Sequence, residues 1–311
     1  MAEVVDLRKC SPEVLQDFLN SFDIVLSDCD GVIWYLENPI EGAVESLRRL
    51  INLGKKLYLV TNNSMISANR YCEKLRKFGF EISPDHIINA SKVVAWYLKK
   101  FNFHGEAFVI ASPNFRQVLS DSGIKLSDEG PQFVESDAMA TLKAMESKTS
   151  VKAVIADFSV SCDWLKLGLA ISCLKRDDVW YLCGAHDEWV VYGNKKKILG
   201  PGPLIDVISK QSGRAPIECG KPSEALKSYI FDVFKIEDPH RCLFIGDTVN
   251  QDMKFGTLCG FLKLFVGTGL DKLEDAQKRN DTCPDFYIES LGLLCPILDK
   301  LLITSKNDTI S

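Results

Sequence analysis

An apolar run, Ile24-Val25-Leu26, leads directly into the polar tetrad Asp28-Cys29-Asp30-Gly31, and this junction limits the fold more than any other segment of the chain. A short apolar run that closes in an acidic loop with glycine is typical of a buried parallel strand whose carboxyl end carries a site. Two carboxylates two residues apart at such an end suit a division of labour between a nucleophile and an acid–base group. The tetrad alone is equally compatible with an ordinary acidic turn, so its companions along the chain must decide.

The order of strand, polar loop and helix is repeated along the first third of the chain. Apolar residues have helical spacing over 43–51 and 67–78, and a second apolar run, 56–60, ends in the polar segment Thr61-Asn62-Asn63-Ser64. Strands that alternate with helices predict a parallel, doubly wound sheet with right-handed crossovers. Both polar loops should then lie at the same edge of the sheet, where open α/β sheets bind ligands.

This order weakens in the middle of the chain and returns later. The middle part mixes strand-like runs with one clear helical segment, 164–174, and is less regular. After it, helix, strand, polar loop and helix follow one another again. We therefore predict an α/β protein with a doubly wound, Rossmann-like parallel core, formed by residues 1–102 and 217–311. An α/β cap domain is expected as an insertion over residues 103–216.

Composition indicates a globular protein and argues against several partners. The chain has 311 residues, of which 46% are hydrophobic and 25% charged, and its net charge is −5. Nucleic acid is not expected as a partner because phosphate backbones favour a basic face. No apolar stretch approaches the roughly 18 residues that span a bilayer, and no signal peptide is visible. The 11 cysteines lack metal-type spacing and indicate reduced thiols, so we expect a cytoplasmic protein without membrane contact.

Three further polar groups follow predicted strands or begin predicted helices. The loop Thr61-Asn62-Asn63 could hold phosphate oxygens, although a helix-capping turn has the same composition. Lys221 could neutralise a nucleophilic carboxylate and the anion it attacks, although taken alone it fits a solvated surface lysine better. Asp247 follows a buried strand and suits ligation of Mg²⁺, whereas Asp252 is either a ligand or a brace for the same loop.

Taken in order, these groups resemble the haloacid dehalogenase superfamily, specifically its branch of phosphoglycolate, pyridoxal-phosphate and p-nitrophenyl-phosphate phosphatases. The resemblance extends over nearly the whole chain. The motifs that carry it are Asp28-Cys29-Asp30-Gly31-Val32-Ile33-Trp34, Thr61-Asn62-Asn63-Ser64, Gly220-Lys221-Pro222-Ser223, Gly246-Asp247 with Asp252, and Pro284-Asp285-Phe286-Tyr287-Ile288-Glu289-Ser290. Such an ordered set is highly specific.

The resemblance implies Mg²⁺-dependent hydrolysis of a small phosphorylated metabolite, similar to phosphoglycolate or pyridoxal phosphate. Asp28 would attack phosphorus and form an aspartyl-phosphate, while Asp30 would protonate the leaving alcohol and then activate water. The metal would be held by the Asp28 carboxylate, the Asp30 backbone carbonyl and Asp247, with Asp252 a candidate for the supporting shell. The phosphoryl group would be held by Thr61, Asn62, Asn63 and Lys221, and Lys221 would also be catalytic.

Asp30 also separates activities within the superfamily. Dehalogenases lack a carboxylate at this place and ion-pumping ATPases have threonine, so the intact pair Asp28 and Asp30 favours a phosphatase. A large α/β insertion after the second motif fits phosphatases better than phosphomutases. Relatives commonly form homodimers through the cap, and we expect the same here. The alternative is a catalytically weak binding or regulatory protein that keeps the fold.

The cap departs from the pattern of the superfamily. Relatives usually have Gly-Phe-Asp where this chain has Asp157-Phe158-Ser159. They usually have Gly-Thr-Asn-x-Asp where this chain has Gly184-Ala185-His186-Asp187-Glu188. The diverged positions are Asp157, Ser159, Ala185, His186 and Glu188. These positions are expected to contact the leaving group of the substrate or the cap hinge. The substrate of a relative is therefore not assigned to this chain.

Overall fold

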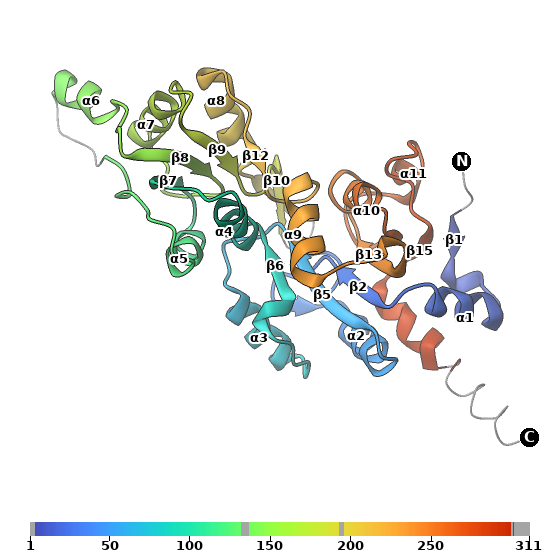
Figure 1. The fold of residues 1–311 in the computed structure, drawn as a ribbon. Helices are drawn as coiled ribbons and strands as arrows, with labels where there is room; N and C mark the ends of the chain where they lie inside the picture. The colour runs from blue at the N-terminus through green and yellow to red at the C-terminus, as the bar shows by residue number, and fades with distance from the viewer. Residues whose placement is uncertain (1–3, 132–136, 193–195, 300, 302–311) are drawn as a thin grey trace, which may run out of the picture.

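Two central sheets organise the molecule (Figure 1). The computed structural model describes residues 4–131, 137–192, 196–299 and 301. The larger sheet has seven parallel strands in the order β1-β15-β14-β13-β2-β5-β6. Its strands are β1 (Val5–Asp6), β2 (Ile24–Ser27), β5 (Lys56–Thr61), β6 (Ile87–Asn89), β13 (Cys242–Gly246), β14 (Leu262–Val266) and β15 (Phe286–Ile288).

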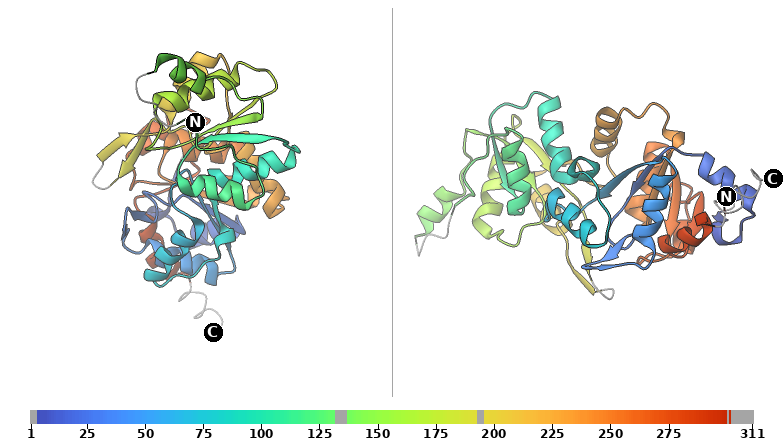
Figure 2. Two further views of the ribbon diagram at one scale, coloured as in Figure 1. Left: turned by 90° about the vertical axis from the view of Figure 1, so that its left-hand side faces the viewer. Right: turned by 90° about the horizontal axis from the view of Figure 1, so that it is seen from below.

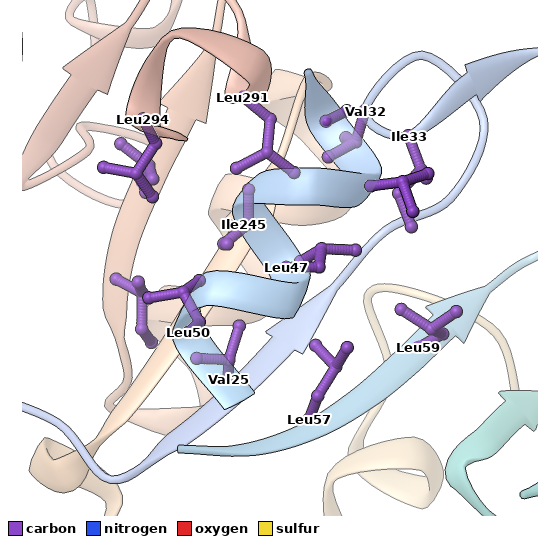
Figure 3. Packing of buried hydrophobic residues seen from close by; sticks show 14 of the residues in the cluster. Val25, Val32, Ile33, Leu47, Leu50, Leu57, Leu59, Ile245, Leu291 and Leu294 are labelled. Atoms are coloured by element: carbon purple, nitrogen blue, oxygen red, sulfur yellow. The ribbon is translucent and has the colours of Figure 1, made fainter. Parts of the chain in front are cut away.

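Helices cover both faces of this sheet. Its helices are α1 (Pro12–Asn20), α2 (Ala43–Asn52), α3 (Ala68–Lys77), α4 (Ala90–Lys100), α9 (Glu224–Phe234), α10 (Lys254–Cys259) and α11 (Leu273–Ala276). Successive strand residues point to opposite faces. Accordingly Val25 packs with α1, α2 and α3, whereas Leu26 packs with α4, α9 and α10. Figure 3 shows the first face, where Leu47 and Leu50 of α2 lie over β2, β5 and β13.

The ends of these helices follow from their capping residues. The Ser11 hydroxyl accepts a hydrogen bond from the Val14 N–H, and Pro12 takes the first helical position. Ser67 and Ser223 cap α3 and α9 in the same way. These signals are local, so the helices predicted near 43–51 and 67–78 begin and end within one or two residues of the observed bounds.

The smaller sheet forms the cap. It has four parallel strands in the order β12-β9-β8-β7. They are β7 (Glu106–Ile110), β8 (Val151–Ala156), β9 (Trp180–Cys183) and β12 (Ile217–Glu218), with helices α5 (Pro113–Asp121), α6 (Ala138–Ala144), α7 (Trp164–Leu174) and α8 (Gly202–Ser212). A hairpin of β10 (Trp189–Tyr192) and β11 (Lys196–Leu199) projects from this lobe, and β3 (Trp34–Tyr35) pairs with β4 (Asn38–Pro39) in the core.

The cap is thus an insertion between β6–α4 and α9 of the core, as the two views of Figure 2 show. Its last strand, β12, ends at residue 218, two residues beyond the predicted limit at 216. Helix α4 lies between the two lobes, because its apolar residues share one buried cluster with both sheets. The predicted class, a doubly wound parallel core with an inserted α/β cap, is confirmed.

All 11 cysteines are free, and Cys29 is fully buried in the core as a packing residue. Burial and the flanking Asp28 and Asp30 raise the pKa of its thiol, which disfavours the reactive thiolate. Among the described helices, none has the length and apolar character needed to cross a membrane.

Candidate active site

Three polar loops meet at one edge of the core sheet. Strands β13, β2 and β5 are neighbours and run parallel, so the loops that follow them leave the sheet side by side. Asp247 and Asp28 follow β13 and β2, and Thr61 is the last residue of β5. Lys221 lies between β12, the last strand of the cap, and α9 of the core. The structure therefore brings the predicted site residues together at the carboxyl edge, where open α/β sheets bind ligands.

Lys221 is the centre of this cluster. Its Nζ donates to Asp28 Oδ1 at 2.6 Å and to Asp252 Oδ1 at 2.7 Å, and its side chain is only 1% exposed. The two carboxylates raise the pKa of Lys221 although burial opposes the rise. The lysine is thus a buried, charged group, which excludes the alternative of a solvated surface residue.

Asp252 braces the loop that holds Asp247. Its Oδ2 accepts hydrogen bonds from the Asp247 N–H at 3.1 Å and from the Thr248 N–H and hydroxyl at 3.0 and 2.6 Å. Its Oδ1 accepts from Lys221. Both oxygens of Asp252 are therefore engaged by protein donors, which favours a supporting role over direct metal ligation.

Asp247 has the opposite character. Its Oδ1 is buried and has no hydrogen-bond partner among the described residues. Burial, Asp28 and Asp252 raise its pKa well above the usual range although Lys221 opposes the rise, so the protein only partly compensates its charged form. A Cβ at Gly31 or Gly269 would lie 2.3 or 2.1 Å from Asp247 Oδ2, so both positions must remain glycine. An unpaired carboxylate oxygen beside Asp28 fits the hard, oxygen-seeking Mg²⁺.

Asp30 is held by Trp34. The indole Nε1 donates to Asp30 Oδ1 at 2.9 Å, and Lys74 Nζ lies 4.2 Å from the centroid of the indole ring. Burial raises the pKa of Asp30, while Lys74 and the hydrogen bond oppose the rise. A carboxyl group that retains its proton more readily than usual is suited to general acid catalysis.

The loop after β5 contains hydrogen bonds between its own residues, and Asn62 of this loop also bonds the backbone of Lys221. Asn62 Oδ1 accepts from the Lys221 N–H at 2.7 Å, and its Nδ2 donates to the Lys221 carbonyl at 3.2 Å. The Asn63 N–H donates to Thr61 Oγ1, and Asn63 Oδ1 accepts from the Met65 N–H. These two contacts are those of an ST turn and an Asx turn, and helix α3 is capped separately by Ser67. Phosphate binding by Thr61, Asn62 and Asn63 stays a prediction.

Two residues that the sequence did not single out reach the same site. The Asp187 carboxylate, on the cap loop after β9, accepts from Asn62 Nδ2 at 3.2 and 3.3 Å. The Gln251 side-chain amide donates to the same carboxylate. Asp187 occupies a variable position of the superfamily pattern, so no motif indicated it. The glycines of the nearby segment Gly200-Pro201-Gly202 are the feature of the sequence that could have indicated a tightly built loop.

Diverged cap residues make other contacts. The Ser64 hydroxyl of the core donates to Asp157 of the cap, and Ser112 and Asn114 bond the Ser64 carbonyl at 3.3 and 2.8 Å. His186 lies with its ring nitrogens 3.0 Å from Glu218 and 2.9 Å from Asp206, and these carboxylates raise its pKa against burial. Asp157 therefore joins the two lobes through Ser64, whereas His186 is held within the cap.

Comparison with known proteins identifies the family of the chain. A family model of haloacid dehalogenase-like hydrolases matches residues 25–125, and a second HAD-hydrolase-like model matches residues 218–294. A glycerol-3-phosphate phosphatase of Gallus gallus is 32% identical, over 94% of this chain and 97% of that protein. The chain belongs to the haloacid dehalogenase-like hydrolase family.

Other members of this hydrolase family match over similar lengths. Human chronophin is 28% identical over 89% of this chain and 94% of its own. A 4-nitrophenylphosphatase of Schizosaccharomyces pombe is 28% identical over 91% and 97%. The fold is shared with a 4-nitrophenylphosphatase of Thermotoga maritima, with a TM-score of 0.75 and 23% identity over 89% and 98% of the two chains. The predicted enzyme class, a phosphoric monoester hydrolase of the haloacid dehalogenase family, is confirmed.

The buried carboxyl of Asp157, which joins the two lobes through Ser64, gives a prediction about stability and pH. Burial raises the pKa of Asp157 to about 7, so folding favours its protonated form. The protonated Asp157 carboxyl therefore makes its full contribution to the stability of the fold below about pH 4, and this contribution is lost as the pH rises through 7. Asn mimics the protonated acid. We therefore expect Asp157→Asn to exceed the wild type in unfolding free energy by about 1–2 kcal/mol at pH 5, rising to about 4 kcal/mol at pH 8.

Denaturant unfolding at several pH values measures this difference. Asp177→Asn, which changes an exposed carboxyl of the cap, is the matched control. A difference between Asp157→Asn and the wild type that stays constant from pH 5 to 8 would contradict the assignment.

Proposed function

We propose that the protein is an Mg²⁺-dependent phosphomonoesterase that acts through an aspartyl-phosphate on a small phosphorylated metabolite. The observation that carries the proposal is the buried Lys221 bridge between Asp28 and Asp252, beside the unpaired oxygen of Asp247. Lys221 is the cation that holds Asp28, the nucleophile, in place. A second cation is needed to balance the charge of Asp247. A phosphoryl group between the two cations would meet positive charge on two sides.

The carboxylates of Asp28 and Asp247 and the backbone carbonyl of Asp30 would hold the metal ion. A glycerol phosphate phosphatase of Mycobacterium tuberculosis, solved in complex with magnesium, has the same fold with a TM-score of 0.72 and 19% identity over 89% of this chain and 77% of its own. When bound, Mg²⁺ neutralises charge on the phosphoryl oxygens and on the attacking carboxylate.

Within this site the side chains perform two chemical steps. A carboxylate oxygen of Asp28 forms a bond to phosphorus while the phosphorus–oxygen bond to the alcohol breaks, and Asp30 gives the leaving oxygen its proton. Water then attacks phosphorus, Asp30 takes the proton of this water, and the bond to Asp28 breaks. Lys221 holds the nucleophile and neutralises the phosphoryl oxygens through both steps, and Trp34 orients Asp30.

Four substrates are candidates. Relatives are named for glycerol 3-phosphate and 4-nitrophenyl phosphate, and the superfamily branch that the sequence resembles includes phosphoglycolate and pyridoxal-phosphate phosphatases. We also propose a cytoplasmic homodimer formed through the cap. Val160 and Trp164 of the cap are 88% and 77% exposed, which makes them suitable contacts for a second copy. Sedimentation of the wild type and of a Trp164→Glu variant tests the dimer.

A binding or regulatory protein is the second candidate function. The cap loop favours it, because the Asp187 carboxylate engages Asn62, a predicted phosphate ligand. Turnover distinguishes the two candidates. We expect purified protein with Mg²⁺ to hydrolyse p-nitrophenyl phosphate and to lose this activity in EDTA. An absence of turnover on a broad panel of phosphomonoesters would leave only the binding function.

Metal binding can be tested without turnover. Mg²⁺ should raise the melting temperature of the wild type, because a ligand that binds only the folded state stabilises it. Asp247→Asn should remove most of this rise. The Asp247→Asn substitution should also stabilise the metal-free protein by about 1–3 kcal/mol, because it replaces a buried carboxylate that is not fully compensated.

Glu274→Gln, which changes an exposed carboxylate of α11, is the control and should keep the full Mg²⁺ response. An equal response in Asp247→Asn would exclude Asp247 as a ligand.

A further inference from the structure

The loop that carries Asp187 is built to hold this residue in one place. The Gly202 N–H donates to the Asp187 carbonyl at 2.9 Å. A Cβ at Gly200 would lie 2.1 Å from the same carbonyl oxygen, so only glycine permits this close approach. On the other side, a Cβ at Gly220 would lie 2.8 Å from the Ala185 Cα. The glycines around the loop therefore fix it directly against the segment that leads into Lys221.

The side chain of Asp187 is held only by neutral groups. Asn62 Nδ2 and the Gln251 amide donate to its carboxylate, and Asp187 forms no ion pair with any described lysine, arginine or histidine. Burial raises its pKa to about 6, although Asn62 and Lys221 oppose the rise. The group is therefore mainly ionised at neutral pH, and its negative charge is not cancelled by a partner.

The position of Asp187 relative to the reaction follows from the contacts of Asn62. This amide bonds the backbone of Lys221 on one side and Asp187 on the other, so the carboxylate lies one side chain away from the phosphate-neutralising lysine. In an in-line displacement the leaving oxygen points away from the nucleophile. Asp28 lies at a core strand end, and Asp187 lies on a cap loop that contacts the core loop after β5 through Asn62. A leaving alcohol that points away from Asp28 toward the cap would therefore come close to the Asp187 carboxylate.

We propose that Asp187 determines substrate specificity by its charge. It favours phosphomonoesters whose leaving alcohol carries a hydroxyl or ammonium group close to the ester, and it disfavours those that carry a carboxylate. A hydroxyl or ammonium group can donate to the carboxylate, whereas a second carboxylate is repelled at close range. This inference rests on the proposed phosphatase function and narrows its substrates to polyol or amino-alcohol phosphates rather than phosphoglycolate.

Three substrates of the same length test this charge preference. Ethanolamine phosphate, 2-hydroxyethyl phosphate and 2-phosphoglycolate have two-carbon leaving groups whose ends are positive, neutral and negative. We expect kcat/KM of the wild type to be about 10- to 100-fold lower for phosphoglycolate than for hydroxyethyl phosphate, by the size of a repulsion between partly buried charges. Asp187→Asn keeps an oxygen for the amide donors. It should raise the phosphoglycolate value and lower the ethanolamine phosphate value, each by about tenfold or more.

An exposed carboxylate of the cap provides the matched control. Asp177→Asn removes the same charge at a position outside the loop that carries Asp187, and it should leave the ratios among the three substrates unchanged. Opposite shifts for the two charged substrates cannot result from a general loss of structure. Equal changes on all three substrates in Asp187→Asn, or phosphoglycolate as the best substrate of the wild type, would overturn the inference. Hydrolysis of p-nitrophenyl phosphate separates the outcomes: if it is absent, the proposed function fails, and if it is present, only the role of Asp187 is in question.

Discussion

Replacing Asp28 with Asn is expected to lower kcat for p-nitrophenyl phosphate by about 10⁴-fold or more, because the amide cannot form the covalent intermediate. The fold should be retained. Asn has the same size as Asp, and Lys221 keeps Asp252 as a partner. Steady-state assays over a range of substrate concentrations measure the loss, and circular dichroism reports the fold.

A direct test of the intermediate accompanies this measurement. Acid quenching during turnover should trap a phosphorylated form of the wild-type protein. The same procedure should give no phosphorylated protein with the Asp28→Asn variant. Asp17→Asn, an exposed residue of α1, is the control and should behave as the wild type does. A trapped phosphoprotein in the Asp28→Asn variant would assign the nucleophile to another residue.

Replacing Lys221 with Met should lower both stability and activity. The side chain of Lys221 is buried between Asp28 and Asp252, and removal of one member of a buried ion pair leaves the other charges uncompensated. Such a loss costs about 3–5 kcal/mol of unfolding free energy in metal-free protein. Activity should fall by about 10²-fold or more, because the phosphoryl group loses a preorganised positive charge.

The two effects of Lys221→Met can be separated. Bound Mg²⁺ should restore part of the stability, because it compensates Asp28, but it should not restore kcat. Lys227→Met, in the half-buried lysine of α9 that pairs with Glu224, is the control and should change the unfolding free energy by less than about 1 kcal/mol. A Lys221→Met variant with wild-type stability would show that the buried charges are compensated in another way.

The elements that the sequence predicted well are those whose signals are local. The caps Ser11, Ser67 and Ser223 define helix starts from neighbouring residues alone. The apolar runs before Asp28 and Asp247 identify buried parallel strands, and parallel strands place their carboxyl ends at one edge. Chain order and residue type were therefore enough to nominate a nucleophile and metal ligands.

Asp187 and Gln251, which the sequence did not indicate, act through contacts between distant parts of the chain. Asp187 meets Asn62 across 125 positions and Gln251 across 64, and the loop sequence contains no signal of either contact. Trp34 is only four residues from Asp30, but its indole donates to that carboxylate because a local turn brings the two together. The hydrophobic character of Trp34 predicts that its side chain is buried. It does not predict the hydrogen bond from the indole to Asp30.

The sequence by itself determined the chemistry of the core: an acidic tetrad at a strand end, with Lys221 and Asp247 on neighbouring loops, in an α/β fold with an inserted cap. These features depend on residue type, periodicity and chain order, which are properties of the sequence. Only the tertiary structure decided how the charges are distributed. It engaged both oxygens of Asp252, left one oxygen of Asp247 unpaired, and placed Asp187 of the cap beside Asn62. The reason is physical, because burial and pairing of a charge depend on every neighbour that folding brings within a few ångströms.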